Sequence, residues 1–198
     1  MSYLGVAVYH GGKMKLIDRR LRLTELLLRS SITVLALLGI ILIVTDTQVK
    51  RIFTIEKRAK YTNMKSFVFL VVVNGIVSVY SLLQTLRCVM GSMKGSVLLN
   101  KSLALAIFSG DQAMAYMSVA AIAAASESGM IGIRGEEELQ WMKVCNMFGK
   151  FCHRGAGGVA STILAAVAMV LVSCISAFSL FRLYGVTNQR PSKLAMVK

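Results

Sequence analysis

Four long apolar runs dominate the sequence, and each is long enough to cross a lipid bilayer. In chain order they are Leu26–Val44, Phe67–Leu86, Ser102–Ala125 and Gly157–Phe181. A spanning helix needs about 20 predominantly apolar residues. In lipid, the backbone of such a run must satisfy its own hydrogen bonds, so even runs rich in β-branched residues form helices. We therefore predict an all-α membrane protein, a bundle of four transmembrane helices with both termini on the same side.

The composition agrees with a membrane protein and argues against a nucleic-acid partner. Apolar residues make up 56% of the chain and charged residues 16%, whereas soluble domains average about 45–50% and about 25%. The net charge is +14, but the basic residues flank the apolar runs and no nucleic-acid-binding motif accompanies them. We attribute this charge to the orientation of the helices in the membrane.

The basic residues also indicate which side the termini occupy. Five of them precede the first run, which favours a cytosolic N-terminus; they are Lys13, Lys15, Arg19, Arg20 and Arg22. We predict a cytosolic N-terminal segment (1–25), a membrane domain (26–184) and a cytosolic tail (185–198). The connections Thr45–Ser66 and Ser126–Ala156 then lie outside. The sole glycosylation sequon, Asn100–Ser102, stays in the cytosol and unmodified.

Two charged residues, Arg29 and Asp111, lie inside the predicted spans. An intramembrane charge costs about 2.5–3.5 kcal/mol on insertion scales, so it usually faces the bundle interior and finds a partner. Arg29 has an alternative, because its long side chain can extend to the nearby membrane surface. Asp111 is close to mid-bilayer and is either paired or protonated. We predict a buried structural ion pair between the two.

Small and polar residues recur at helical spacing in three of the runs. Residues Asn74, Ser78, Ser81 and Thr85 share one face of the second helix, which suits interhelical packing; a polar pathway for ions or solute is the alternative. Small-residue pairs with close-packing spacing occur in the third run (Ser109 and Ala113) and the fourth (Gly157, Ser161 and Ala165). We expect the fourth helix to turn this face outward for self-association, because Asp111 should draw the third helix inward.

The four cysteines differ by location. Cys145 and Cys152 fall in the second outside connection, where oxidising conditions permit a disulfide. A metal site with His153 and free thiols are the alternatives. Seven residues of straight helix would separate the two Cα atoms by about 10.5 Å, which is too far to bridge. A disulfide therefore requires a turn between them, and Gly149 is the expected place.

Sequence motifs of catalysis are missing. The chain has no phosphate-binding loop, dinucleotide fingerprint or zinc-protease motif, and no nucleophile elbow. The acidic run Glu136, Glu137 and Glu138 is typical of a solvated loop. We predict no catalytic residues, no metal and no cofactor, and hence no enzyme.

Three segments resemble the Casparian strip membrane protein-like family of plants. They are Lys60–Gln84, the stretch FSGDQAMAYMSVAAIAAASE around Asp111, and Trp141–Gly158; Arg29 matches the hallmark arginine of the family's first helix. The resemblance spans about Leu26 to Tyr184. It implies kinship to the MARVEL group of four-helix membrane proteins, cytosolic termini and plasma-membrane residence.

The first outside connection departs from the members that build the strip itself. Those members carry a short motif there that is missing from TDTQVKRIFTIEKRAKYTNMKS. The resemblance implies a non-enzymatic scaffold that forms homo- and hetero-oligomers with its relatives in the lipid membrane and organises a membrane and cell-wall domain, with wall-modifying enzymes as candidate partners. The alternative is a small channel or transporter that uses Asp111 as its ion or proton site.

Overall fold

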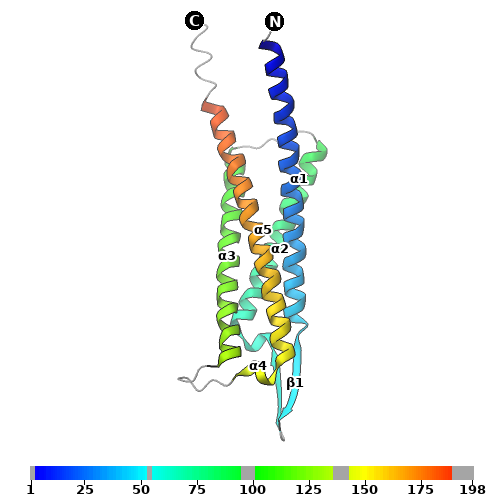
Figure 1. Ribbon diagram of the computed structural model, residues 1–198, viewed down its shortest axis with the longest axis vertical. Coiled ribbons are helices and arrows are strands. Elements are labelled where there is room, and N and C mark those ends of the chain that lie inside the picture. Colours follow the sequence, from blue (N-terminus) through cyan, green and yellow to red (C-terminus); the bar gives the residue numbers. More distant parts are fainter. Residues whose placement is uncertain (1–2, 53–54, 95–100, 136–142, 189–198) are drawn as a thin grey trace.

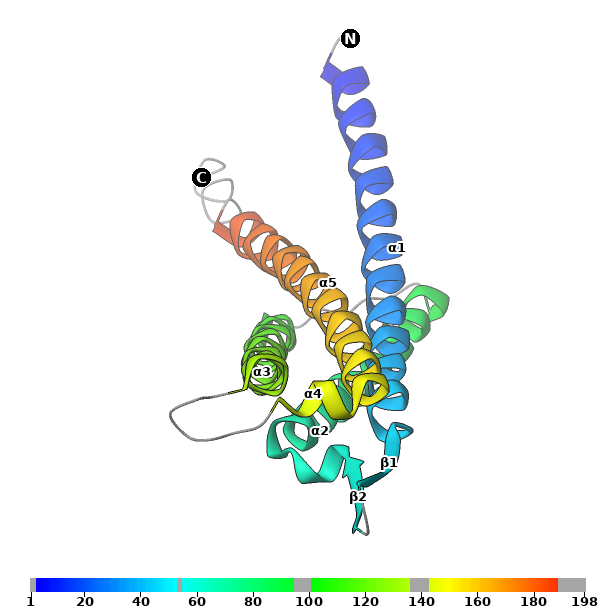
Figure 2. The same ribbon diagram turned by 60° about the horizontal axis from the view of Figure 1, so that its bottom comes forward.

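The computed structural model describes residues 3–52, 55–94, 101–135 and 143–188 as a bundle of four long helices. These are α1 (Tyr3–Val44), α2 (Lys65–Lys94), α3 (Lys101–Arg134) and α5 (Gly149–Asn188). All four are long and apolar enough to span a membrane. The N-terminal end of α1 and the C-terminal end of α5 lie at the same end of the bundle (Figure 1), opposite the β1–β2 hairpin (Figure 2). The predicted fold class is confirmed: the protein is an all-α membrane protein with four spanning helices.

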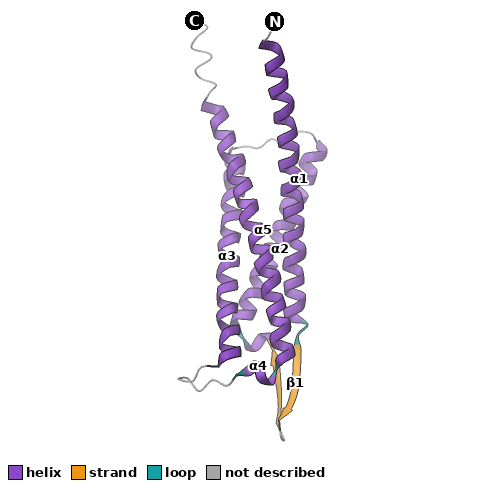
Figure 3. Cartoon of the chain, in the orientation of Figure 1, coloured by secondary structure: helices purple, strands orange, loops and turns teal. Residues whose placement is uncertain are grey.

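The connections at the opposite end contain structure that the hydropathy pattern did not predict. Strands β1 (Thr47–Ile52) and β2 (Ile55–Lys60) form an antiparallel hairpin, followed by a 3-10 turn (Tyr61–Asn63). Thr47 pairs with Lys60 at the base of the hairpin. A short helix, α4 (Val144–Met147), precedes α5. Figure 3 shows that the hairpin projects from the end of an otherwise helical molecule.

The helices are longer than the apolar runs that predicted them, so the connection expected at Ser126–Ala156 is partly helical. Helix α3 continues to Arg134, and α5 already begins at Gly149. The end of α3 is set by Gly135, whose φ of 71° is the left-handed conformation that glycine adopts most easily at a helix C-terminus. Its N–H donates to the Ile131 carbonyl at 2.8 Å. The hydropathy of the sequence indicates where the lipid ends, whereas the backbone conformation of Gly135 determines where the helix ends.

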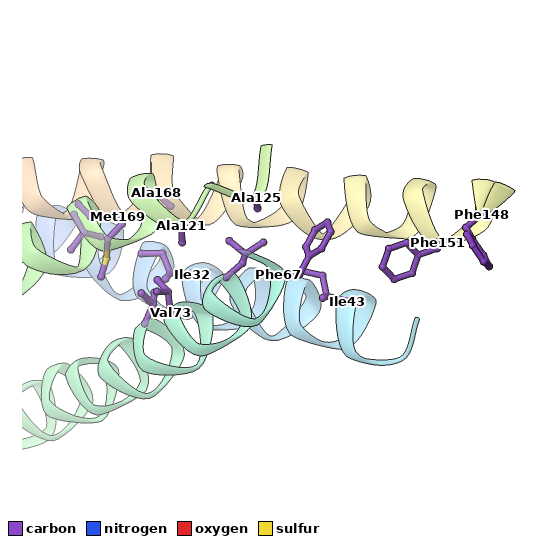
Figure 4. Close-up of a cluster of buried hydrophobic side chains, with 14 residues drawn as sticks. Ile32, Ile43, Phe67, Val73, Ala121, Ala125, Phe148, Phe151, Ala168 and Met169 are labelled. Atoms are coloured by element: carbon purple, nitrogen blue, oxygen red, sulfur yellow. The ribbon is translucent and has the colours of Figure 1, made fainter. Parts of the chain in front are cut away.

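A cluster of buried apolar side chains forms the core of the bundle. It runs from Met169 and Val73 to an aromatic group near the hairpin end (Figure 4). There Phe67 of α2 and Phe151 of α5 meet edge to face, with ring centroids 6.2 Å apart. Many large apolar side chains on the outer faces are instead exposed, such as Val34 at 65%. In a membrane protein, these faces are covered by lipid hydrocarbon.

Candidate functional site

A buried ion pair lies at the centre of the bundle and joins α1 to α3. Two guanidinium nitrogens of Arg29 donate to the two carboxylate oxygens of Asp111: Nη1 to Oδ1 at 3.0 Å and Nη2 to Oδ2 at 2.8 Å. Both side chains have 0% exposure. This two-bond geometry is the strongest that arginine and a carboxylate can form. The Arg29 side chain therefore points into the bundle and does not extend to the membrane surface.

Helices α2 and α5 contribute to the same group of side chains. The Tyr80 hydroxyl donates to Asp111 Oδ1 at 2.8 Å, and the Ser176 hydroxyl donates to Oδ2 at 2.6 Å. Glu25, one turn before Arg29, accepts a bond from Arg29 Nε at 3.0 Å. Each spanning helix thus supplies at least one member. We call Glu25, Arg29, Tyr80, Asp111 and Ser176 the central polar node.

The central polar node is suited to holding helices together. A carboxylate offers about four lone-pair directions, and the Asp111 carboxylate receives four hydrogen bonds, two on each oxygen. An incoming cation or proton would have to displace an existing donor. Buried polar groups that are fully satisfied rigidify a core and favour one arrangement of it.

Sequence reasoning missed Glu25, Tyr80 and Ser176, although a signal existed for two of them. Glu25 and Arg29 are four residues apart, which is the spacing of a helical ion pair. A tyrosine within an apolar run needs a partner for its hydroxyl, and Tyr80 is such a residue. Ser176 gave no comparable signal, because serine hydroxyls in helices commonly bond to their own backbone.

A second polar group lies where α2 and α5 meet near α1. The Asn74 amide donates to the Thr162 hydroxyl at 2.8 Å, and that hydroxyl donates to the Gly158 carbonyl at 2.9 Å. The Ser161 hydroxyl reaches the Leu35 carbonyl of α1 at 2.8 Å. The predicted polar face of α2 therefore contributes Asn74 to interhelical bonding.

The other members of that face are used differently. The Ser78 hydroxyl donates to the Gly75 carbonyl of its own helix at 2.9 Å, and that of Thr85 to the Ser81 carbonyl at 2.8 Å. The Ser81 hydroxyl is buried and makes no hydrogen bond with the described residues. Ser78 and Ser81 are buried at 6% and 0% exposure, and Thr85 is half-buried, so this face packs against neighbouring side chains.

The small-residue faces are oriented opposite to our expectation. We expected Gly157, Ser161 and Ala165 to face outward, but Ser161 and Ala165 are buried at 6% and 3% exposure. The physical reason is that α5 needs this face to approach α1, as the Ser161 bond to α1 shows. On α3, Ser109 and Ala113 are exposed. The prediction that α5 presents its small residues to a neighbouring copy is therefore wrong.

The hairpin end is held together by a disulfide and several polar contacts. Cys145 of α4 and Cys152 of α5 are bonded, with their Cα atoms 5.7 Å apart. The chain turns between them at Phe148, just before α5 begins at Gly149. The Phe151 N–H donates to the Gln48 side chain of β1 at 3.1 Å. The first connection is thereby joined to the second.

Asp46 lies at the start of this end, just outside the apolar run of α1. It is 3% exposed, and one oxygen lies 3.9 Å from Arg154 Nη1. Burial raises the pKa of Asp46, and the charge of Arg154 opposes that shift. Because the pKa is higher in the folded state, ionisation of Asp46 costs stability. The contribution of Asp46 to the stability of the folded protein should therefore increase as the pH falls through its raised pKa.

Loss of the disulfide is expected to destabilise the hairpin end by about 2 kcal/mol, since the bridge closes a short loop. The change is Cys145→Ser with Cys152→Ser, and the measurement is thermal unfolding in lipid nanodiscs with and without reductant. Reductant should lower the midpoint of the native chain to that of the variant. The matched control is Cys174→Ser, since Cys174 is a free and exposed cysteine. Alkylation of Cys145 and Cys152 in the unreduced native protein, in addition to the free Cys88 and Cys174, would contradict the prediction.

The fold and the node define a class: a four-helix membrane protein whose spans are joined by a buried arginine–aspartate pair. Residues 18–187 match the profile of the Casparian strip membrane protein domain. The chain belongs to the Casparian strip membrane protein-like family.

Relatives of known name match over nearly the whole chain. CASP-like protein 2B1 of Arabidopsis thaliana is 71% identical over 177 residues, which cover 89% of this chain and 97% of that protein. CASP-like protein 2B2 of the same plant is 59% identical over 198 residues, which cover 97% of this chain and 98% of that protein. CASP-like protein 2B1 of Ricinus communis is 58% identical, covering 93% and 95%. No solved structure matches.

Proposed function

We propose that this protein is a non-enzymatic scaffold that self-associates in the plasma membrane and organises a patch of membrane and adjoining cell wall. The observation that supports the proposal best is the central polar node. The Asp111 carboxylate of that node is occupied by donors from three other helices. A rigid bundle with its intramembrane charges neutralised suits a structural role. Family membership supports the same class.

Helix α3 is the face we propose for contact between copies. Its outward side carries Ala106, Ser109, Ala113, Ala120 and Ala123, all of them exposed. Small side chains at such spacing allow helix backbones to approach closely in lipid. The equivalent face of α5 is already occupied by α1, so it is not available to a second copy. Family relatives with a similar α3 are the proposed partners in mixed oligomers.

Self-association is expected to make the protein immobile in the plasma membrane. A fluorescent fusion should recover slowly after photobleaching, and crosslinking in native-lipid particles should give oligomers. Replacing Ser109 and Ala113 with leucine should reduce the crosslinked species several-fold while the monomer accumulates normally. Leucine at Val119, which is already large and 53% exposed on α3, serves as the control. A strictly monomeric native protein would refute the scaffold.

The alternative is a small channel or transporter, which the burial of an acid at Asp111 favours on general grounds. A flux assay on reconstituted protein separates the two. A scaffold gives no flux above that of empty vesicles, in the native chain or in Asp111→Asn. Flux that Asp111→Asn abolishes, from a variant that still folds, would establish the transporter.

The proposed orientation places both termini in the cytosol. In sealed right-side-out vesicles, tags on either terminus should resist added protease, while the hairpin at β1 and β2 should be cut. The motivation is the basic N-terminal segment, together with a disulfide at the end opposite the termini, which suits an oxidising exterior. Glycan on Asn100, which lies outside the described residues, would reverse the orientation.

A further inference from the structure

The first outside connection carries an excess of positive charge that membrane topology does not explain. Between Thr45 and Ser66 the chain has two acidic residues and six basic ones; the basic residues are Lys50, Arg51, Lys57, Arg58, Lys60 and Lys65. Basic residues normally collect in the short cytosolic connections of a membrane protein. In the proposed orientation this connection lies outside, so its charge runs against that preference. The excess indicates that the charges themselves have a function.

The hairpin concentrates most of these basic residues on two paired strands. Strand β1 carries Lys50 and Arg51, and strand β2 carries Lys57, Arg58 and Lys60. The register places Lys50 directly opposite Lys57. Like charges directly opposite each other destabilise a strand pair, and a two-stranded hairpin is marginally stable in water. An anionic partner would relieve this repulsion.

The start of α5 extends the basic surface of the hairpin. The Phe151 N–H donates to the Gln48 side chain of β1, so this turn of α5 lies against the hairpin. Lys150 is exposed. The Arg154 side chain is 59% exposed, although one of its nitrogens lies 3.9 Å from Asp46. We call the hairpin, together with Lys150 and Arg154, the basic end surface.

Acidic residues at the same end do not cancel this charge. Glu56 lies on β2 and faces Arg51 in the register. Asp46 is buried at 3% exposure, and Glu127 is exposed on α3. The run Glu136–Glu138 lies outside the described residues. The five basic residues of the two strands therefore outnumber the one acidic residue there.

The hairpin projects away from the membrane, which argues against lipid headgroups as its partner. Figures 1 and 3 show β1 extending beyond the end of α1. Three strand steps from Thr47 place Lys50 about 10 Å beyond the base of the hairpin. The headgroup layer on each side of a bilayer is about 5–7 Å thick, and salt screens charges over about 8 Å. The paired lysines therefore lie in the aqueous space outside the headgroups.

The spread of the charges favours an extended polymer over a folded protein. Protein interfaces are built around a buried apolar and aromatic centre. Among the side chains of this connection that the structure describes, none of the exposed ones is aromatic. The basic residues instead follow both strands along their length. A polymer with one carboxylate on each sugar can engage several of them at once, so that individually weak ion pairs act together.

We propose that the basic end surface binds an acidic polysaccharide of the cell wall, a polymer of uronic acids. The proposal rests on the proposed orientation and deepens the proposed scaffold function, because it names the wall component that the protein would hold. The contact is separate from self-association, since it uses the hairpin end and the self-association face lies on the spanning part of α3.

The test measures binding of fluorescent polygalacturonate oligomers to the full-length protein in phosphatidylcholine nanodiscs, in which both ends of the bundle are accessible. The matched ligand is the same oligomer with its carboxylates methyl-esterified, which removes the charge. The native chain should bind the acidic oligomer at least about tenfold more tightly than the ester. Raising the salt from about 50 mM to about 200 mM should weaken that binding several-fold, because screening increases.

The variant Lys50→Gln with Lys57→Gln removes the charges that lie opposite each other in the register. It should weaken binding of the acidic oligomer about tenfold, or about threefold for each lysine. Its thermal unfolding midpoint should be unchanged or higher, because the two lysines repel each other, and this measurement separates a loss of binding from a loss of fold. The matched control is Lys13→Gln with Lys15→Gln, which makes the same change of charge near the N-terminus and should leave the affinity unchanged.

Four outcomes would overturn the proposal. They are equal affinity for the acidic and the esterified oligomer, and an equal loss of affinity in the Lys13 and Lys15 control. The third is tighter binding to vesicles that contain phosphatidylserine, which would assign the surface to lipid. The fourth is tighter binding to polyglutamate, which would assign it to an acidic protein. Each of these results leaves self-association untouched, because crosslinking of the native chain measures that separately.

Discussion

Asp111→Asn and Arg29→Gln are each expected to destabilise the bundle by about 3–5 kcal/mol, because either change leaves one buried charge without its partner. Thermal unfolding in nanodiscs and accumulation in cells should both report the loss. The matched control is Ser30→Ala, which removes an exposed hydroxyl from the residue next to Arg29 and should change little.

The double variants identify the pair as the cause. Arg29→Gln with Asp111→Asn removes both charges and should cost clearly less than the sum of the single changes. The swapped pair, Arg29→Asp with Asp111→Arg, should recover only in part. Glu25 would then face a second acid, and the hydroxyl donors Tyr80 and Ser176 would face a cation.

Removal of one hydroxyl donor tests the remainder of the node. Tyr80→Phe or Ser176→Ala deletes a single hydrogen bond to a charged group, worth about 1.5–3 kcal/mol. Strictly additive double variants, with no coupling among the five residues, would contradict the view that the node acts as a unit.

The fold was predictable because lipid leaves the backbone few choices. An apolar run such as Phe67–Leu86, with no charge in it, has one stable form in a bilayer. The ends of the helices were less predictable. The hydropathy of Ser126–Arg134 does not show that α3 continues through these residues. The helix ends where Gly135 adopts a left-handed backbone conformation, and hydropathy carries no information about that conformation.

Of the five residues of the central polar node, sequence analysis predicted Arg29 and Asp111 and missed the charged Glu25. Arg29 and Asp111 stand out because intramembrane charges are costly and rare. The Tyr80 hydroxyl indicated a need for a partner but not which one, and Ser176 gave no signal, because the role of both depends on how the helices are rotated. The same rotation decides which small-residue face is buried. Spacing alone identified the face containing Ser161, but the partner it packs against required the structure.

Gly158→Ala is expected to destabilise the bundle by about 1–3 kcal/mol, the usual cost of overpacking a close contact. Helices α1 and α5 cross at Gly39 and Gly158. A Cβ at Gly158 would lie 2.5 Å from Ile43 Cγ1 and 3.3 Å from the Gly39 carbonyl oxygen. The Ile43 side chain is 2% exposed and has little room to move.

The neighbouring glycine separates this steric effect from the general preference of helices for alanine. Gly157→Ala places its Cβ 3.7 Å from the nearest atom of Leu42, an ordinary contact distance. In a helix interior, alanine is favoured over glycine by about 0.8–1.0 kcal/mol. The two substitutions should therefore shift the unfolding midpoint in opposite directions, upward for Gly157 and downward for Gly158.

A second change at the contact shows where the strain lies. Ile43→Ala removes the methyl and methylene groups that approach Gly158, so the double variant Gly158→Ala with Ile43→Ala should lose less than the sum of the two single changes. The recovery of stability should be incomplete, because the Cβ at position 158 also approaches the Gly39 carbonyl oxygen. That oxygen belongs to the backbone, so no side-chain substitution removes it. Since close backbone approach holds helices together in lipid, a downward shift specific to Gly158 would locate the tightest contact of the bundle at this crossing. Equal shifts for Gly157 and Gly158 would show that α1 and α5 are not in close contact there.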